Sequence, residues 1–165
     1  MGNSHKRKQL FGEAQCLIQL EQTTVIAGRN IQGVVHLDIK RQHPASFVEL
    51  LVTAVESRYW VETETRERGE GNDRTTETIE LERSKQINHL ELRKPIHFFP
   101  DRCAHVGQFS IPFDFEIPVH SPPSYIFRGN KKSEFEMKYT LIARLSDPEK
   151  KVKDIEGERV LLVRN

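Results

Sequence analysis

Two stretches in the second half of the chain have apolar residues at every second position, and they constrain the fold more than any other feature. They span residues 107–118 and 135–145. A period of two is typical of a β-strand that buries one face and exposes the other. The sequence therefore predicts two half-buried strands. The alternating apolar residues are Phe109, Ile111, Phe113, Phe115 and Ile117, followed by Phe135, Met137, Tyr139, Leu141, Ala143 and Leu145.

The same alternation recurs elsewhere in the chain. It predicts further strands at residues 16–20, 31–40, 48–61, 79–81, 90–92 and 159–164. Residues 62–78 contain no aliphatic side chain and predict a mobile, solvated loop, while Pro95 and Pro100 are expected to break the chain. About eight short strands separated by turns, without a long helical pattern, predict an all-β fold, an immunoglobulin-like antiparallel β-sandwich.

Length and charge limit the domain organisation and the classes of partner. The chain has 165 residues, enough for one domain with a core of ordinary size. We expect a flexible basic tail over residues 1–9 and a single sandwich domain over residues 10–165. With 25 Lys and Arg against 24 Asp and Glu, the molecule has no overall field that would attract nucleic acid. We therefore expect protein partners and no nucleic acid.

The cysteines and the apolar runs indicate a cytoplasmic location. Cys16 and Cys103 are the only cysteines, and neither belongs to a CxxC pair or a dense cysteine framework. Free thiols in a reducing compartment are therefore favoured over a disulfide between them. No apolar run approaches the roughly 18 residues of a membrane-spanning helix, so the chain is predicted to be soluble.

The N-terminal tail leaves two interpretations open. Gly2 is followed within a few residues by the basic Lys6, Arg7 and Lys8, a pattern that suggests N-myristoylation beside a polybasic patch and peripheral contact with a membrane. The lipidation motif, however, has Ser or Thr at the position of Lys6. This mismatch favours the other interpretation, an unmodified flexible tail.

Three segments share the sequence pattern of one protein family. Residues 27–39 contain a Gly, a few residues, a second Gly and then a strand, and residues 47–62 form a strand that ends with Trp60 two residues before Glu62. Residues 107–125 contain a Gly, a strand similar to FPF, and Pro-rich steps that lead to an aromatic residue. These patterns resemble the N-terminal domain of the arrestins, closest to the α-arrestin or arrestin domain-containing proteins.

The resemblance implies an arrestin N-domain type of sandwich that works as a non-catalytic adaptor. Such a protein would bind membrane cargo or trafficking machinery, in the cytoplasm or peripherally at membranes or endosomes. The alternative that it implies is a retromer-like coat subunit that scaffolds a helical partner. Arrestins carry a second sandwich after this domain, so the chain is expected to be either a fragment or a one-domain relative. An enzyme that uses Cys103 and His105 is the least favoured class, because no catalytic motif is visible.

A PPxY match occurs within the family signature, at Pro122, Pro123 and Tyr125. This motif binds WW domains of ubiquitin ligases when it lies in an exposed, extended segment, as in the tails of α-arrestins. Here alternating strands flank it on both sides. We therefore predict a structural role for it, as a joint between strands.

Two basic features are candidate contact sites. The resemblance places Arg164 where arrestins have a buried phosphate-sensing Arg, yet the first strand lacks the Lys pair that accompanies it, which favours a solvated side chain. Arg128, Lys131 and Lys132 form a basic loop that could contact lipid phosphates or an acidic peptide, with simple solvation as the default.

The sequence predicts no metal and no cofactor. His97, Cys103 and His105 are the only neighbouring metal-capable side chains that stand out, and their spacing lacks the four-ligand pattern of a zinc site. No Gly-rich phosphate loop, nucleophile elbow or paired general acid and base can be identified either. Binding, rather than catalysis, is therefore the predicted activity.

Overall fold

The computed structural model describes residues 14–130 and 132–165, which form strands connected by turns. The strands are β1 (Ala14–Leu20), β2 (Thr24–Ile26), β3 (Asn30–Ile39), β4 (His43–Pro44), β5 (Phe47–Arg68), β6 (Thr75–Phe98), β7 (Cys103–Ala104), β8 (Gly107–Glu116), β9 (Tyr125–Arg128), β10 (Glu134–Leu145) and β11 (Ile155–Arg164). Two short 3₁₀ turns, η1 (Gly71–Asp73) and η2 (Pro100–Arg102), are the helical elements of these residues. None of the helices in this described part has the length and apolar character needed to cross a membrane.

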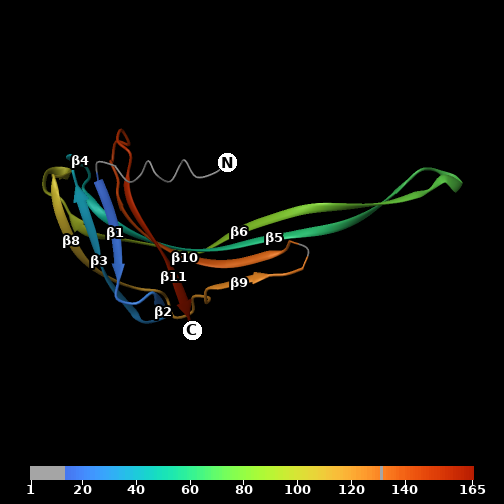
Figure 1. Cartoon of the computed structure of the whole chain (residues 1–165), viewed down its shortest axis with the longest axis horizontal. Helices are drawn as coiled ribbons and strands as arrows, with labels where there is room; N and C mark the ends of the chain where they lie inside the picture. Colours follow the sequence, from blue (N-terminus) through green and yellow to red (C-terminus); the bar gives the residue numbers. More distant parts are fainter. Residues whose placement is uncertain (1–13, 131) are drawn as a thin grey trace, which may run out of the picture.

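Two sheets enclose one core (Figure 1). The smaller sheet has the order β1-β3-β8, and the larger has the order β2-β11-β10-β5-β6, with β9 also paired to β10. Neighbouring strands are antiparallel except for β2 and β11, which run parallel. β4 and β7 form a separate two-stranded ladder. The predicted all-β class and antiparallel β-sandwich are confirmed.

The two alternating stretches form β8 and β10, and they lie in different sheets. β8 pairs with β3 in the smaller sheet, whereas β10 is a central strand of the larger one. From Ile111 to Phe115 and from Met137 to Leu145 their inward-facing residues are buried in one core, while the residues between them are exposed or half-buried. Phe109 and Phe135, at the outer ends of the two rows, are only half-buried. The period of two thus reports which face of each sheet is removed from water.

Residues 62–78, which the sequence predicts as a mobile loop, instead form the outer part of a long β-hairpin. β5 continues to Arg68 and β6 begins at Thr75, so that only the turn around η1 separates them. The short strands expected at residues 79–81 and 90–92 are likewise parts of the single strand β6. In Figure 1 this hairpin extends far beyond the sandwich.

The prediction of a loop is wrong because a strand does not need a buried face to form the hydrogen bonds of its backbone. The β5–β6 ladder continues without interruption from Val55 to Arg68, although every residue from 62 to 78 is exposed. Cross-strand ion pairs support it, including Arg83 Nε to Glu62 Oε2 at 3.1 Å. Absence of aliphatic side chains therefore indicates absence of a core at this place, and not absence of a strand.

Pro95 was expected to break the chain, yet it lies inside β6. β6 is the edge strand of the larger sheet, so a residue without an amide hydrogen costs little when that position faces outward. The register also shifts here, since Glu49 pairs with Pro95 and Val48 with His97, which leaves Ile96 as an extra residue. Pro100 does end the strand region, because it opens η2.

The two sheets approach each other closely where β1 meets β11. Arg159 Nε donates a hydrogen bond to the Ile18 carbonyl at 2.9 Å, and the Cys16 thiol lies 3.7 Å from the Ala143 carbonyl oxygen. Both cysteines are free thiols, and burial raises the pKa of Cys16 to about 12. Gly157 makes this approach possible, because an added Cβ would lie 2.5 Å from the Cys16 carbonyl oxygen.

Replacing Gly157 with alanine should therefore destabilise the sandwich. The new methyl group would meet the backbone of β1, which can move only by separating β1 from β11. We expect Gly157→Ala to lower the free energy of unfolding by about 1–3 kcal/mol in urea denaturation. Gly129→Ala is the matched control, because its Cβ would meet the ring of the exposed Phe127 at 3.3 Å, and that ring can turn aside. Equal losses in both variants would contradict the explanation.

Candidate functional site

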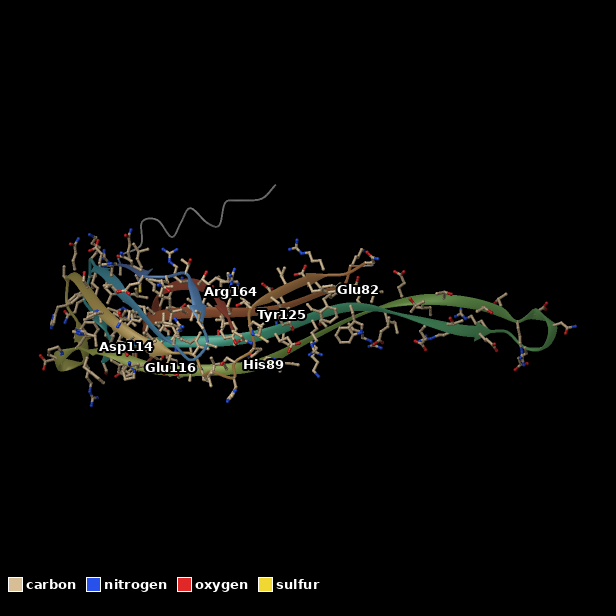
Figure 2. The ribbon with its side chains drawn as sticks, turned by 90° about the horizontal axis from the view of Figure 1, so that it is seen from below. Glu82, His89, Asp114, Glu116, Tyr125 and Arg164 are labelled. Carbon is tan, nitrogen blue, oxygen red and sulfur yellow. The ribbon has the colours of Figure 1, made fainter. Side chains whose placement is uncertain are left out.

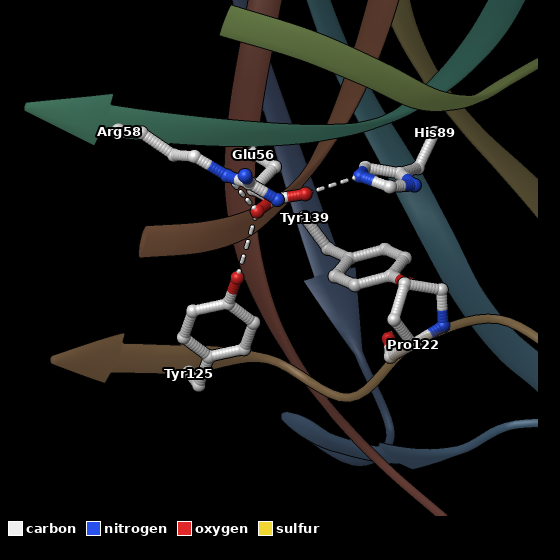
Figure 3. Close-up of polar contacts among 6 residues, drawn as sticks. All are labelled: Glu56, Arg58, His89, Pro122, Tyr125 and Tyr139. Carbon is white, nitrogen blue, oxygen red and sulfur yellow. Dashed lines mark hydrogen bonds and ion pairs between the residues drawn. The ribbon is translucent and has the colours of Figure 1, made fainter. Parts of the chain in front are cut away.

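The connection from β8 to β9 contains the PPxY match and is held by hydrogen bonds to its backbone carbonyls. The Ser121 amide donates to the Pro118 carbonyl at 2.9 Å, and the buried Tyr139 hydroxyl donates to the Pro122 carbonyl at 2.5 Å. Tyr125 then begins β9. The structure thus places Pro122 against the core residue Tyr139 (Figure 3), while Pro123 and Tyr125 are exposed.

Ser124 attaches the start of β9 to the end of β11. Its amide donates to the Val163 carbonyl at 2.9 Å, and its hydroxyl oxygen accepts from the Val163 amide at 2.9 Å. The hydroxyl also donates to the Leu161 carbonyl at 3.4 Å. Sequence reasoning did not identify this residue, since nothing in the local pattern of a serine after two prolines reveals a partner 39 residues away.

A polar cluster lies in the part of the larger sheet that extends beyond the smaller sheet, where β5 is still paired with both β6 and β10. Glu56, from β5, is only 5% exposed, and its carboxylate accepts hydrogen bonds from three side chains (Figure 3). These are Arg58 Nε at 2.5 Å, His89 Nε2 at 2.6 Å and the Tyr125 hydroxyl at 3.2 Å. The cluster therefore links β5, β6 and β9 at one point.

The backbone geometry explains why these side chains converge. Glu56 pairs with Met137, which pairs with Tyr125, so the three side chains point to the same side of the sheet and Tyr125 reaches across Met137. On β6, Ala54 pairs with Leu90 and Val55 with Asn88, so His89 is the extra residue of a β-bulge. Bulges redirect a side chain, and this one directs His89 to Glu56.

The cluster favours the ionised form of Glu56. The hydrogen bond from Arg58, followed by that from His89, lowers the pKa of the Glu56 carboxyl from 4.5 to about 2, against the opposing effect of burial. Glu56 in turn raises the pKa of the Arg58 guanidinium. Desolvation and the neighbouring Glu56 both raise the pKa of Tyr125, which keeps its hydroxyl a donor.

Sequence reasoning missed Glu56 and His89 as a pair. A usable signal was present, since Val48, Leu50, Val52 and Ala54 occupy inward positions of β5 and Glu56 continues the same alternation. A charged residue at the end of an apolar row requires partners when it is buried. The identity of those partners could not be read from the sequence, because they lie on other strands.

The basic loop predicted around residue 128 is the tip of the β9–β10 hairpin. The Gly129 amide donates to the Ser133 carbonyl at 2.9 Å and closes the hairpin. Arg128 is exposed and pairs with Glu134, Nε to Oε2 at 3.2 Å, while Lys132 is exposed in the turn with a φ of 61°. Lys131 lies outside the described residues.

The structure places Arg164 at the end of β11, away from the core. Its carbonyl accepts a hydrogen bond from the Ala27 amide at 2.9 Å, but its side chain is exposed, whereas Leu161 and Val163 face inward. Figure 2 shows Arg164 apart from Asp114 and Glu116 on β8. Gly2, the candidate lipidation site, lies outside the described residues.

The candidate metal ligands make other contacts. The His97 ring packs edge-on against Phe99, with 4.8 Å between ring centroids, and the Cys103 thiol lies 3.6 Å from the His43 carbonyl oxygen. Among residues 14–130 and 132–165, no group of three or more His, Cys, Asp and Glu side chains is arranged to hold a metal ion.

A groove of about 450 Å³ lies beside β9 on the outer face of the larger sheet. It forms where β9 and the end of β11 diverge after the Ser124 hydrogen bonds. The apolar residues that line it include Ile126 of β9 and Val160 and Leu162 of β11, which are 56%, 56% and 43% exposed. Exposed apolar side chains in a groove are typical of a protein-binding surface.

The Glu56 cluster leads to a testable dependence of stability on pH. A carboxylate whose pKa is lowered by folding stabilises the folded state above its unfolded pKa, and this contribution is lost as pH falls through the folded pKa. We therefore expect Glu56→Gln to be less stable than the natural chain by a constant difference from pH 5 to 6, a difference that shrinks between pH 4.5 and about 2. Urea denaturation at several pH values measures it.

Glu64→Gln provides the control, because Glu64 is exposed and, within the described part of the chain, forms its ion pair with Arg66 on the same strand. It should change stability by less than about 0.5 kcal/mol at every pH. A Glu56→Gln deficit that stays constant down to pH 2 would show that the carboxylate does not act through its charge.

The chain is similar to a described protein family and to solved structures. Residues 16–164 match the family described as "Arrestin (or S-antigen), N-terminal domain". Among solved structures, the sporulation control protein Spo0M from Bacillus subtilis is similar with a TM-score of 0.48 and 15% identity, covering 93% of this chain and 50% of that one. The chain thus spans half the length of that structure. No curated protein sequence matches it.

The family match covers almost all of the described sandwich, from the third residue of β1 to the last residue of β11. It includes the three segments whose pattern resembles the arrestins. The match is to the family as a whole, so the α-arrestin branch stays a prediction. On this evidence the chain belongs to the arrestin family and corresponds to its N-terminal domain.

Proposed function

We propose that this chain is a non-catalytic adaptor of the cytoplasm that binds membrane-protein cargo or trafficking machinery. Its membership of the arrestin family supports a role in binding protein partners. Fold and family do not by themselves select the partner, which depends on the surfaces that the chain exposes. The proposal therefore rests on a particular surface feature.

The observation that carries the proposal is the β5–β6 hairpin, whose outer part, residues 62–81, forms an arm. Figure 2 shows Tyr125 and His89 near its base and Glu82 farther along it, with the tip well beyond the sandwich. All residues from 62 to 78 are exposed, yet the ladder holds them in a defined shape. An ordered arm without a core of its own offers a large contact area with little loss of conformational entropy on binding.

The charges of the arm favour a protein partner over nucleic acid. Basic residues are interspersed among a larger number of acidic residues along it, and some of them pair, as in Arg66 with Glu64 and Arg83 with Glu62. A surface with both signs does not attract a polyanion, but it can be complementary to a mixed protein surface. Peripheral membrane contact through Gly2 and the basic residues of the tail is part of the same proposal.

Shortening the arm tests the proposal. Val61 and Glu82 face each other, so residues 62–81 can be replaced by an Asn-Gly turn without disturbing the remaining register. We expect the full chain, expressed in its own host, to co-purify with membrane proteins or trafficking components, and the shortened chain to lose them at unchanged thermal stability. Thr76→Ser, on the exposed arm, is the control and should retain them.

Each outcome of that experiment has a distinct meaning. If the full chain enriches no partner, the adaptor proposal fails. If both chains enrich the same partners, binding does not use the arm. A single stoichiometric helical partner would instead favour the retromer-like scaffold.

We also propose that Pro122, Pro123 and Tyr125 act as a structural joint and not as a WW ligand. The bonds from Tyr139 to Pro122 and from Tyr125 to Glu56 support this. In a pulldown with an isolated WW domain, the folded chain should not bind, and Tyr125→Ala should mainly lower the midpoint of thermal unfolding. If the WW domain captures the folded natural chain but not a folded Tyr125→Ala variant, the proposed structural role of the joint is refuted.

A further inference from the structure

The outer edge of β9 has backbone groups that point away from the sheet. Hydrogen-bonded pairs alternate with non-bonded pairs along an antiparallel ladder. Because the Gly129 amide bonds to Ser133 of the β10 side, Phe127 and Tyr125 also direct their backbone groups to β10. The amides and carbonyls of Ile126 and Arg128 therefore face outward, on the same side as the Ser124 amide that bonds to Val163.

Within the described residues, β9 pairs with β10 alone. The outward amides and carbonyls of Ile126 and Arg128 could therefore form hydrogen bonds with one further strand placed beside β9. Ser124 closes one end of this position through Val163, and the β9–β10 turn marks the other. β9 has four residues, which at about 3.3 Å per residue corresponds to roughly 13 Å of strand.

This edge lacks the usual protection against strand pairing. Natural sheets cover their edges or place charges, prolines or bulges on them. β6, at the opposite edge of the larger sheet, follows this rule with Glu80, Glu82, Arg83 and Lys85. In β9, three of the four residues are apolar or aromatic and exposed, namely Tyr125 at 40%, Ile126 at 56% and Phe127 at 57%.

The side chains beside the edge define what a paired strand would contain. On the outer face, the groove between Ile126, Val160 and Leu162 accommodates apolar side chains. On the inner face, Phe127 packs against Phe135 with ring centroids 6.1 Å apart and still exposes more than half of its surface. An incoming strand with β-branched residues would therefore bury apolar surface on both of its faces.

The charge at the β9–β10 turn indicates which charge the nearby end of a paired strand would carry. Arg128 and Lys132 are exposed there, next to Lys131 in the sequence, and among the described residues Glu134 pairs with Arg128 and not with Lys132. This leaves a net positive charge at the end of the edge. An acidic residue in the bound segment would complement it.

We propose that the β9 edge binds a short extended peptide segment of a partner protein by strand addition, with β-branched residues against Ile126 and Phe127 and an acidic residue at the basic turn. This inference rests on the proposed adaptor function and names a docking surface for it. Main-chain hydrogen bonds to Ile126 and Arg128 would supply affinity, and the groove would supply selectivity.

The probe is a synthetic peptide with blocked ends and the sequence Glu-Val-Thr-Val-Thr-Val-Glu. NMR titration of the full chain gives its Kd, and amide hydrogen exchange at saturation gives the site. We expect exchange to slow at least about tenfold at the amides of Ile126 and Arg128, since strand pairing protects them. The same peptide N-methylated at alternate residues should bind at least about tenfold more weakly, because it cannot complete the ladder.

Ile126→Pro removes the outward amide and leaves the bonds to β10 in place, because the Ile126 amide does not take part in that ladder. We expect it to weaken binding about tenfold or more. Ile126→Val keeps the amide and a β-branched side chain, and should bind within about twofold of the natural chain. The comparison with the N-methylated peptide uses the natural protein, so it decides the question even if Ile126→Pro fails to fold.

The inference is overturned if no binding is detected at millimolar peptide, if protection appears on another edge, or if Ile126→Pro binds equally well. A peptide with Lys in place of both Glu should bind more weakly, and equal binding would remove the acidic preference. Each of these results contradicts peptide binding at the β9 edge without contradicting the adaptor proposal. The adaptor proposal is decided by whether the full chain co-purifies with any partner.

Discussion

The structure depends on the contact between its two sheets, to which each sheet contributes a row of alternating apolar side chains. Ile111, Phe113 and Phe115 of β8 and Tyr139, Leu141 and Ala143 of β10 belong to the same buried core. Burying such side chains contributes about 1.5–3 kcal/mol for each large one, and this sum drives the formation of the sandwich. β10 is central in its sheet, so β5 and β11 are held in place by the same contact.

The candidate binding surfaces begin where that contact ends. Beyond the smaller sheet, Glu56 takes the next inward position and the apolar row is replaced by hydrogen bonds from Arg58, His89 and Tyr125. Farther out, the hairpin keeps only its backbone ladder and exposed charged pairs. The Glu56 cluster thus joins a sandwich stabilised by apolar burial to an arm that is free to contact a partner.

Sequence reasoning recovered the fold because alternation and turn residues are local signals. The strands at residues 107–118 and 135–145, the sandwich class and the arrestin resemblance all followed from patterns within a few residues. The hairpin was missed because its outer strands bury nothing, so their apolar pattern is absent although their ladder is present. His89 was missed because its role comes from a bulge, and a bulge depends on the register of β6 against β5.

The amino-acid sequence by itself determined the fold class, the inward faces of the main strands and the family, because these depend on hydrophobic periodicity and on motifs along one segment. Only the tertiary structure decided which strands share a sheet, that Ser124 bonds to Val163, and that the outward amides of β9 are left beside an apolar groove. The physical reason is that hydrogen bonds between strands and the environment of a sheet edge are set by segments that are distant along the chain and meet only in the folded state.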